Sequence, residues 1–250
     1  MTDDQAKQAE RIQALLAKAE STTHPAEADA YMAKAQELMT KYAIDELQLV
    51  AQGKLKSLGE IVTVKVDVPA PHADVKIQGI HWLSFLHQCR VVMGSKQFKP
   101  GSNRRVVLGQ SVWITGYEHD VERLQLTFTS LSVQCTNEML KATKPAHVEV
   151  TEFRRAFVYG YFDRVTTRLR EAHERTQTEA VEAFGGSLLP ALVDKGSAVD
   201  RAYAEQWEGQ TTRGSLDGIG SRHGRRAGRE AGDRADLGHT RFGQSKGAIR

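Results

Sequence analysis

Apolar residues recur every three or four positions in the first part of the chain, and this spacing predicts two helices. The first helix is expected over 8–20 and the second over 25–43. Pro25 suits the first position of a helix, where its missing N–H leaves no hydrogen bond unmade. Because only five residues separate the two segments, we expect them to form an antiparallel αα-hairpin. The apolar stripes are Ile12, Leu15, Leu16 and Ala19 in the first helix and Ala28, Tyr31, Met32, Ala35, Leu38, Met39 and Tyr42 in the second.

The spacing changes to every second residue after position 59, which predicts strands. Valines alternate with polar residues over 60–68, so a half-buried strand is expected there, and helical spacing returns over 75–89. Turn-forming residues at 99–103 and 109–111 then divide the next stretch into short segments joined as a meander. The sequence therefore predicts a small antiparallel sheet of about four strands. The three meander segments are 91–98, 104–108 and 112–116.

Two long helices and a shorter one are predicted after the sheet. The first long helix begins at Glu118, and the second follows Pro145 and ends at Gly185. The shorter helix is expected over about 191–207. The apolar stripes of the long helices are Val121, Leu124, Phe128, Leu131 and Cys135 in the first and Phe153, Phe157, Tyr161, Val165 and Leu169 in the second.

Glycine recurs at every fourth position near the end of the chain, at Gly220, Gly224, Gly228 and Gly232, which we call the glycine ladder. On a helix this spacing produces one stripe without side chains beside a row of arginines. Each glycine costs about 1 kcal/mol relative to alanine inside a helix, so four in register indicate a specific use. The stripe must allow close approach of another backbone or of an anion.

These patterns together predict an α+β protein. We expect three parts: an N-terminal helical hairpin over 1–50, an α+β domain with two long helices over 51–208, and a basic tail rich in glycine and arginine over 209–250. The tail contains ten of the 21 glycines. Its most helix-compatible stretch is 222–237.

Composition and charge indicate where the protein is located and what kind of partner it binds. The first ten residues are polar and no apolar run approaches the roughly 20 residues needed to cross a bilayer, so a cytoplasmic protein without a membrane partner is expected. Cys89 and Cys135 are far apart, which favours reduced core thiols over a disulfide or metal motif. Residues 222–250 hold eight Lys or Arg against three Asp or Glu, whereas the preceding 221 residues hold 26 against 28. The tail is therefore the expected contact for an anionic partner.

The N-terminal segment resembles a known family. The stretches 12–22, 25–28, 33–39 and 42–45 are similar to the domain of unknown function numbered 2786, which is common in actinobacteria and their bacteriophages. Later stretches, 116–122, 153–162 and 227–238, resemble the second domain that usually follows it and the usual ending. His24 departs from the pattern, which more often has a short polar cap before the proline. The resemblance implies an architecture and a setting, but no established activity, catalytic residue or cofactor.

Recognisable catalytic patterns do not occur in the sequence. It contains no P-loop, no Gly-x-Ser-x-Gly elbow and no His-Glu-x-x-His helix. Glu118, His119, Asp120 and Glu122 could bind a metal, but consecutive helical residues diverge, so a charged helix start explains them better. His81 and His87 are six residues apart and do not share a helical turn, while position 177, four residues after His173, is Gln. We therefore expect no metal and no cofactor, although Cys89 paired with a distant histidine remains an open alternative.

The glycine ladder has two interpretations. In the structural one, the glycines pack against the helix that carries Phe153 and Leu169, and the arginines face solvent or pair with Glu230, Asp233 and Asp236. In the functional one, basic side chains of the tail contact nucleic-acid phosphates. Both hold if the glycine side packs inward. The candidate contacts are Arg222, Arg225, Arg226, Arg229, Arg234, Arg241 and Lys246.

The first hypothesis for function is a non-enzymatic cytoplasmic accessory protein of a phage or actinobacterium. It would bind nucleic acid or a nucleoprotein complex through the basic tail, as the charge segregation indicates. The second is a protein-interaction module in which the N-terminal hairpin binds a host or self partner through Tyr31 and Tyr42. An enzyme whose site has no sequence signature is the third. The oligomeric state is not predicted.

Overall fold

The computed structural model describes residues 59–100, 106–184, 188–211, 216, 218–235 and 237, together with eight positions between 11 and 38. The chain divides into two compact units. One contains 59–174 and 189–235, and the other contains 1–58, 175–188 and 236–250. The first of these carries the sheet and the glycine ladder.

The predicted N-terminal hairpin lies mostly outside the described residues. The eight described positions before residue 39 are helical, and the Lys18 ammonium lies 5.8 Å from the centre of the Tyr31 ring. Tyr42 lies outside the described residues. The hairpin itself therefore stays a prediction.

Three strands form one antiparallel sheet in the order β1-β3-β2. They are β1 (Ile61–Pro69), β2 (Arg90–Phe98) and β3 (Val107–Tyr117). The chain runs from β1 through helix α3 (Ala73–Leu86) to β2, and then turns directly into β3, which inserts between the other two. Val64 and Val91 both lie opposite Ile114, so these three residues face the same side of the sheet.

The prediction of about four strands is wrong, because the expected turn at 109–111 lies inside β3. Gly109 pairs with Pro69 across the ladder. A Cβ at Gly109 would lie 2.6 Å from the Val68 carbonyl oxygen, so glycine here permits close strand approach rather than a turn. Residues 107–108 of one predicted segment and the whole of the segment predicted at 112–116 therefore belong to one strand, while 101–105 lie outside the described residues.

The long helices are confirmed. They are α4 (Glu118–Lys141) and α5 (Val150–Phe184), and the predicted shorter helix follows as α6 (Leu188–Trp207). The last helix, α7 (Arg222–Arg234), carries three of the four glycines of the glycine ladder. The aromatic stripe predicted for α5 is buried at Phe153, Phe157 and Tyr161. The structure is thus a mixed α+β fold with five helices in its described residues.

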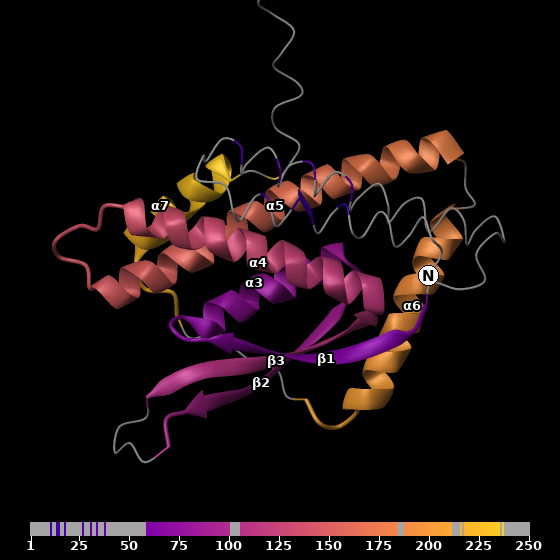
Figure 1. The fold of residues 1–250 in the computed structure, drawn as a ribbon, viewed down its shortest axis with the longest axis horizontal. Coiled ribbons are helices and arrows are strands. Elements are labelled where there is room, and N and C mark those ends of the chain that lie inside the picture. Colours follow the sequence, from indigo (N-terminus) through magenta and orange to yellow (C-terminus); the bar gives the residue numbers. More distant parts are fainter. Residues whose placement is uncertain are drawn as a thin grey trace, which may run out of the picture. The chain divides into compact units, whose positions relative to one another are not determined.

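Helices cover both faces of the sheet. Helices α3 and α4 lie against the face that carries Ile114, and α5 crosses beyond them (Figure 1). On α3, Gly79 lets α5 approach, since a Cβ there would lie 2.6 Å from the Phe162 ring. On the opposite face, Trp113 of β3 contacts Trp207 of α6, with ring centres 5.7 Å apart. The core therefore lies between the sheet and the α3, α4 and α5 layer.

Candidate functional site

Helix α7 packs on α5 through the glycine ladder. A Cβ at Gly224 would lie 2.3 Å from the Phe153 carbonyl oxygen, and a Cβ at Gly228 would lie 2.1 Å from that of Phe157. On α5, Gly160 serves the same purpose, because a Cβ there would lie 2.2 Å from the Arg225 carbonyl oxygen. The helices therefore meet backbone to backbone, and the prediction that the glycines face inward is confirmed.

Polar contacts hold both ends of α7. The Ser221 hydroxyl accepts a hydrogen bond from the Gly224 amide at 3.1 Å, as expected of an N-cap serine. At the other end, the Arg168 guanidinium of α5 donates to the carbonyl oxygens of Gly232 at 2.6 Å and Ala235 at 2.8 Å. These are carbonyl groups that a helix end leaves without an internal partner. The position of α7 on α5 is thus set by backbone contacts and by both termini.

Three of the predicted phosphate contacts form ion pairs. Arg226 pairs with Glu230 at 2.8 Å, as predicted, Arg229 with Asp163 of α5 at 2.9 Å, and Arg234 with Glu138 of α4 at 2.9 Å. Asp233, a predicted partner of the tail arginines, is instead bound by Arg164 of α5 at 2.5 Å. The predicted partner Asp236 lies outside the described residues. These arginine side chains are 59% to 83% exposed, so their pairs contribute little to stability.

The other predicted contacts differ in position. Arg222 is exposed and has no ion-pair partner among the described residues. Arg225 is half-buried and donates to the Ile219 carbonyl oxygen at 3.3 Å, so it serves the packing of α7. Arg241 and Lys246 lie outside the described residues. The structure therefore places Arg222, Arg226 and Arg229 together on the outward side of α7, and we call these three residues the arginine face.

Charge is distributed unevenly along α7. The first carboxylate of the helix is Glu230, so its N-terminal half carries arginines without an acidic residue. His223 lies in this half, with its ring 5.5 Å from that of His147. Before the helix begins, the Glu152 carboxylate of α5 lies beside Gly220, where an added Cβ would be within 3 Å of it. An anion would therefore be attracted most strongly to the N-terminal half.

A second set of polar residues gathers inside the protein, around the start of α4. Asp120 binds Lys195 of α6, with 2.7 Å between Oδ2 and Nζ, and its other oxygen binds Arg123. Burial opposes ionisation of Asp120, but Arg123 and Lys195 outweigh it, and the pKa of Asp120 is lowered. Asp120 thus lies in the first turn of α4, as predicted, and its side chain is buried. Its side chain joins α4 to α6 through buried ion pairs.

Cys89 and His87 lie beside these charges, which bears on the open alternative of a cysteine nucleophile. Burial and then Asp120 raise the pKa of the Cys89 thiol. Burial and then the Arg123 charge lower the pKa of His87 to about 3. Near pH 7 the thiol is therefore protonated and the imidazole neutral, which is the reverse of an activated thiolate–imidazolium pair.

The described residues contain no group of three or more His, Cys, Asp or Glu side chains placed to hold a metal ion. No helix in that part of the chain is both long enough and apolar enough to cross a membrane.

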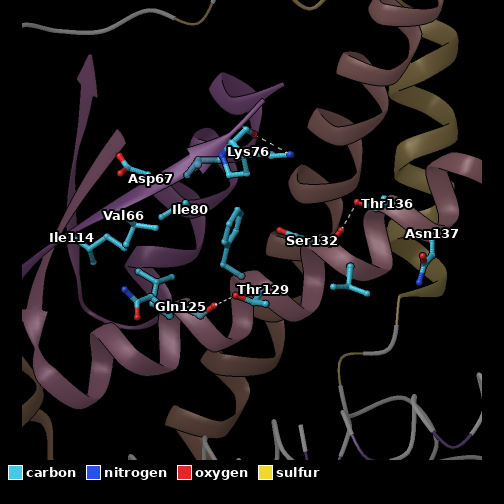
Figure 2. Close-up of a pocket in the computed structure, with 15 residues that line it drawn as sticks. Val66, Asp67, Lys76, Ile80, Ile114, Gln125, Thr129, Ser132, Thr136 and Asn137 are labelled. Carbon is cyan, nitrogen blue, oxygen red and sulfur yellow. Dashed lines mark hydrogen bonds between the residues drawn. The ribbon is translucent and has the colours of Figure 1, made fainter. Parts of the chain in front are cut away.

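A cavity that the sequence did not predict lies between β1 and α4. Its volume is about 660 Å³, and Figure 2 shows Ile80, Ile114 and Val66 on one side and residues of α4 on the other. Polar residues of α4 at 125, 129, 132 and 136 line it at spacings of three and four. This periodic polar stripe beside the apolar stripe of α4 was the one indication of the cavity wall that the sequence contained. Because the other walls come from β1, α3 and β3, the stripe alone does not reveal a cavity.

Comparison with known proteins places the N-terminal segment. Residues 7–46 match the model of a family described as a protein of unknown function, DUF2786. The resemblance predicted from the sequence is therefore confirmed for this segment. No curated protein and no solved structure matches the chain.

Proposed function

We propose that this protein binds nucleic acid, alone or within a nucleoprotein complex, through the arginine face of α7. The observation that carries the proposal is the unbalanced charge of the N-terminal half of α7, which is held outward because the opposite side of the helix is packed on α5. Arg222 and Arg226 are four residues apart on the helix, so their Cα atoms lie about 6 Å apart along the axis. This spacing suits successive phosphates of one strand.

The existing ion pairs are compatible with this role. Arg226 and Arg229 hold carboxylates in water-exposed pairs, and such pairs contribute at most about 1 kcal/mol. A phosphate can replace the carboxylate as partner and also releases counterions from the nucleic acid. Contacts of this kind carry no base readout, so the proposed binding is independent of sequence.

The proposal includes the setting that the sequence resemblance implies, a cytoplasmic accessory role in an actinobacterium or its phage. It also includes Arg241 and Lys246 as further contacts. The role is binding rather than catalysis.

A titration against salt tests the proposal. Fluorescence anisotropy of a labelled DNA duplex should give a log–log salt slope of about −4.5 if the three arginines, Arg241 and Lys246 all contact phosphates. Changing Arg222, Arg226 and Arg229 to Gln should remove most of that slope. A chain ending at Leu237 keeps α7 and removes Arg241, Lys246 and Arg250, so it measures the share of the basic residues after position 237 separately.

The matched control removes the same formal charge elsewhere, at Lys65, Lys99 and Arg201, which are exposed. This control should bind as the unchanged protein does. Equal weakening of both variants would show attraction by net charge alone, and absence of binding in low salt would refute the proposal.

A further inference from the structure

The cavity between β1 and α4 has a continuous apolar wall. Its residues come from four elements: β1, α3, β3 and α4. A volume of about 660 Å³ lies within the range of small-molecule sites, which are mostly apolar with a few placed polar groups. The apolar wall is formed by Val66, Val68, Ile80, Ile114, Leu124 and Phe128.

The polar residues of α4 contribute little charge to the cavity. The Thr129 hydroxyl donates to the Gln125 carbonyl oxygen at 2.8 Å, and the Thr136 hydroxyl donates to that of Ser132 at 2.8 Å. Figure 2 shows both bonds lying along the helix. Their protons are therefore committed to the helix backbone, and the α4 side of the cavity is neutral.

Lys76 of α3 is the one cation among the described residues that line the cavity. Its ammonium donates to the Pro69 carbonyl oxygen at 3.3 Å, and no carboxylate of the described residues lies within ion-pair distance. Burial lowers the pKa of Lys76, which shows that its charge is poorly solvated. The ammonium therefore has unused donors at the edge of an apolar space.

The one carboxylate among the described lining residues has other partners than Lys76. Asp67 accepts a hydrogen bond from the Gln97 amide at 2.8 Å and lies 3.6 Å from the Lys65 ammonium. Its side chain is 57% exposed. Asp67 thus faces water at the rim and leaves Lys76 without a counter-charge.

We propose that this cavity binds an apolar monocarboxylic acid, with the carboxylate on the Lys76 ammonium and the hydrocarbon part against the apolar wall. The anion supplies the missing counter-charge, and the hydrocarbon part covers the half-buried side chains of Val66 and Phe128. This site is separate from the arginine face, so either proposal can fail without the other.

Decanoate is a suitable probe, with decan-1-ol as its uncharged counterpart and acetate as the carboxylate without a chain. Isothermal titration of the full chain should show one decanoate bound with a Kd of about 100 μM. Decan-1-ol should bind about tenfold more weakly, because it lacks the charge-assisted hydrogen bond, and acetate should not bind measurably.

Two variants separate the contributions. Lys76→Gln should weaken decanoate about tenfold, to the level of the alcohol, whereas Lys65→Gln should not change it. Thr129→Trp should block both ligands, because the indole fills the cavity from an exposed position and leaves Lys76 in place. Circular dichroism verifies the fold of each variant. Equal affinity for acid and alcohol, unchanged binding by Lys76→Gln, or no decanoate binding would each overturn the proposal.

Discussion

The contact between α7 and α5 and the gap between α4 and β1 are opposite outcomes of packing a helix on its neighbour. In the first, glycines on both helices bring the two backbones together, and a single added carbon at Gly228 would lie 2.1 Å from a carbonyl oxygen, far inside van der Waals contact. In the second, side chains of ordinary size leave about 660 Å³ open. The first region holds the arginine face of α7 outward, whereas the second leaves a cavity between β1 and α4.

The comparison shows how each region can serve binding. Because α7 is fixed by backbone contacts, it presents the arginine face at a constant position. The contact between α7 and α5 does not itself select a ligand. A helix that stands away from its neighbour leaves part of the apolar wall, at Val66 and Phe128, in contact with water, which is unfavourable unless something fills the space. Substitutions that add or remove single groups test this contrast directly.

The largest effect is expected for Gly228→Ala. The new Cβ would lie 2.1 Å from the Phe157 carbonyl oxygen and 2.9 Å from the Tyr161 amide nitrogen, so α7 must move off α5. We expect the free energy of unfolding to fall by about 3 kcal/mol, the upper part of the range for overpacking. Urea denaturation measures it.

Gly196→Ala on α6 is the matched control, because a Cβ there would meet no atom within 4 Å. It should stabilise the protein by up to about 1 kcal/mol, since alanine is the better helix former. If both substitutions had the same sign, close packing would not be the reason for the glycine ladder.

Arg168→Met is expected to have the next largest effect. Methionine keeps much of the apolar stem of the side chain but removes the donors to the Gly232 and Ala235 carbonyl oxygens. Loss of these bonds should cost about 1–2 kcal/mol and should increase hydrogen exchange at the C-terminal end of α7. Arg170→Met, at an exposed position two residues along α5, should change stability by less than about 0.5 kcal/mol. If both variants changed the stability equally, the hydrogen bonds from Arg168 to the end of α7 would not be the cause.

A smaller effect should depend on pH through Glu138. Hydrogen bonds from Lys141 and Arg234 lower the pKa of Glu138. Because the folded pKa lies below the unfolded one, the pair stabilises the protein above the unfolded pKa, and this contribution is lost as pH falls through the folded pKa. Glu138→Gln should therefore cost up to about 1 kcal/mol at pH 7 and nothing once the pH is below the folded pKa of Glu138. Glu122→Gln, exposed on the same helix, should show no such pH dependence, and a constant difference for Glu138→Gln would rule out the ion pair as its cause.

Sequence reasoning succeeded where a structure depends on neighbours along the chain. The glycine ladder and the aromatic stripe of α5 repeat every four residues, so each defines a helix face by itself, and the two faces fit together. It failed at Gly109, where the same residue type that makes turns instead allows two strands to approach. The buried ion pair of Asp120 was not predicted because its partner Lys195 is 75 positions away. The cavity was missed for the same reason, since Lys76, Val66 and Phe128 belong to three separate elements.

The smallest effect is expected for Val66→Ile, which adds one methylene on the cavity wall. Both residues are β-branched and suit a strand, so the backbone should not change. We expect a gain of about 0.5 kcal/mol in the free energy of unfolding, somewhat less than full burial of a methylene gives. Val165→Ile adds the same group to a side chain that is 0% exposed on α5, and there it should cost at least about 1 kcal/mol. Thermal and urea unfolding of both variants measure the pair. Opposite signs would establish that the two regions differ in free space, whereas a loss of stability in both would mean that the cavity wall is already closed to a single added carbon.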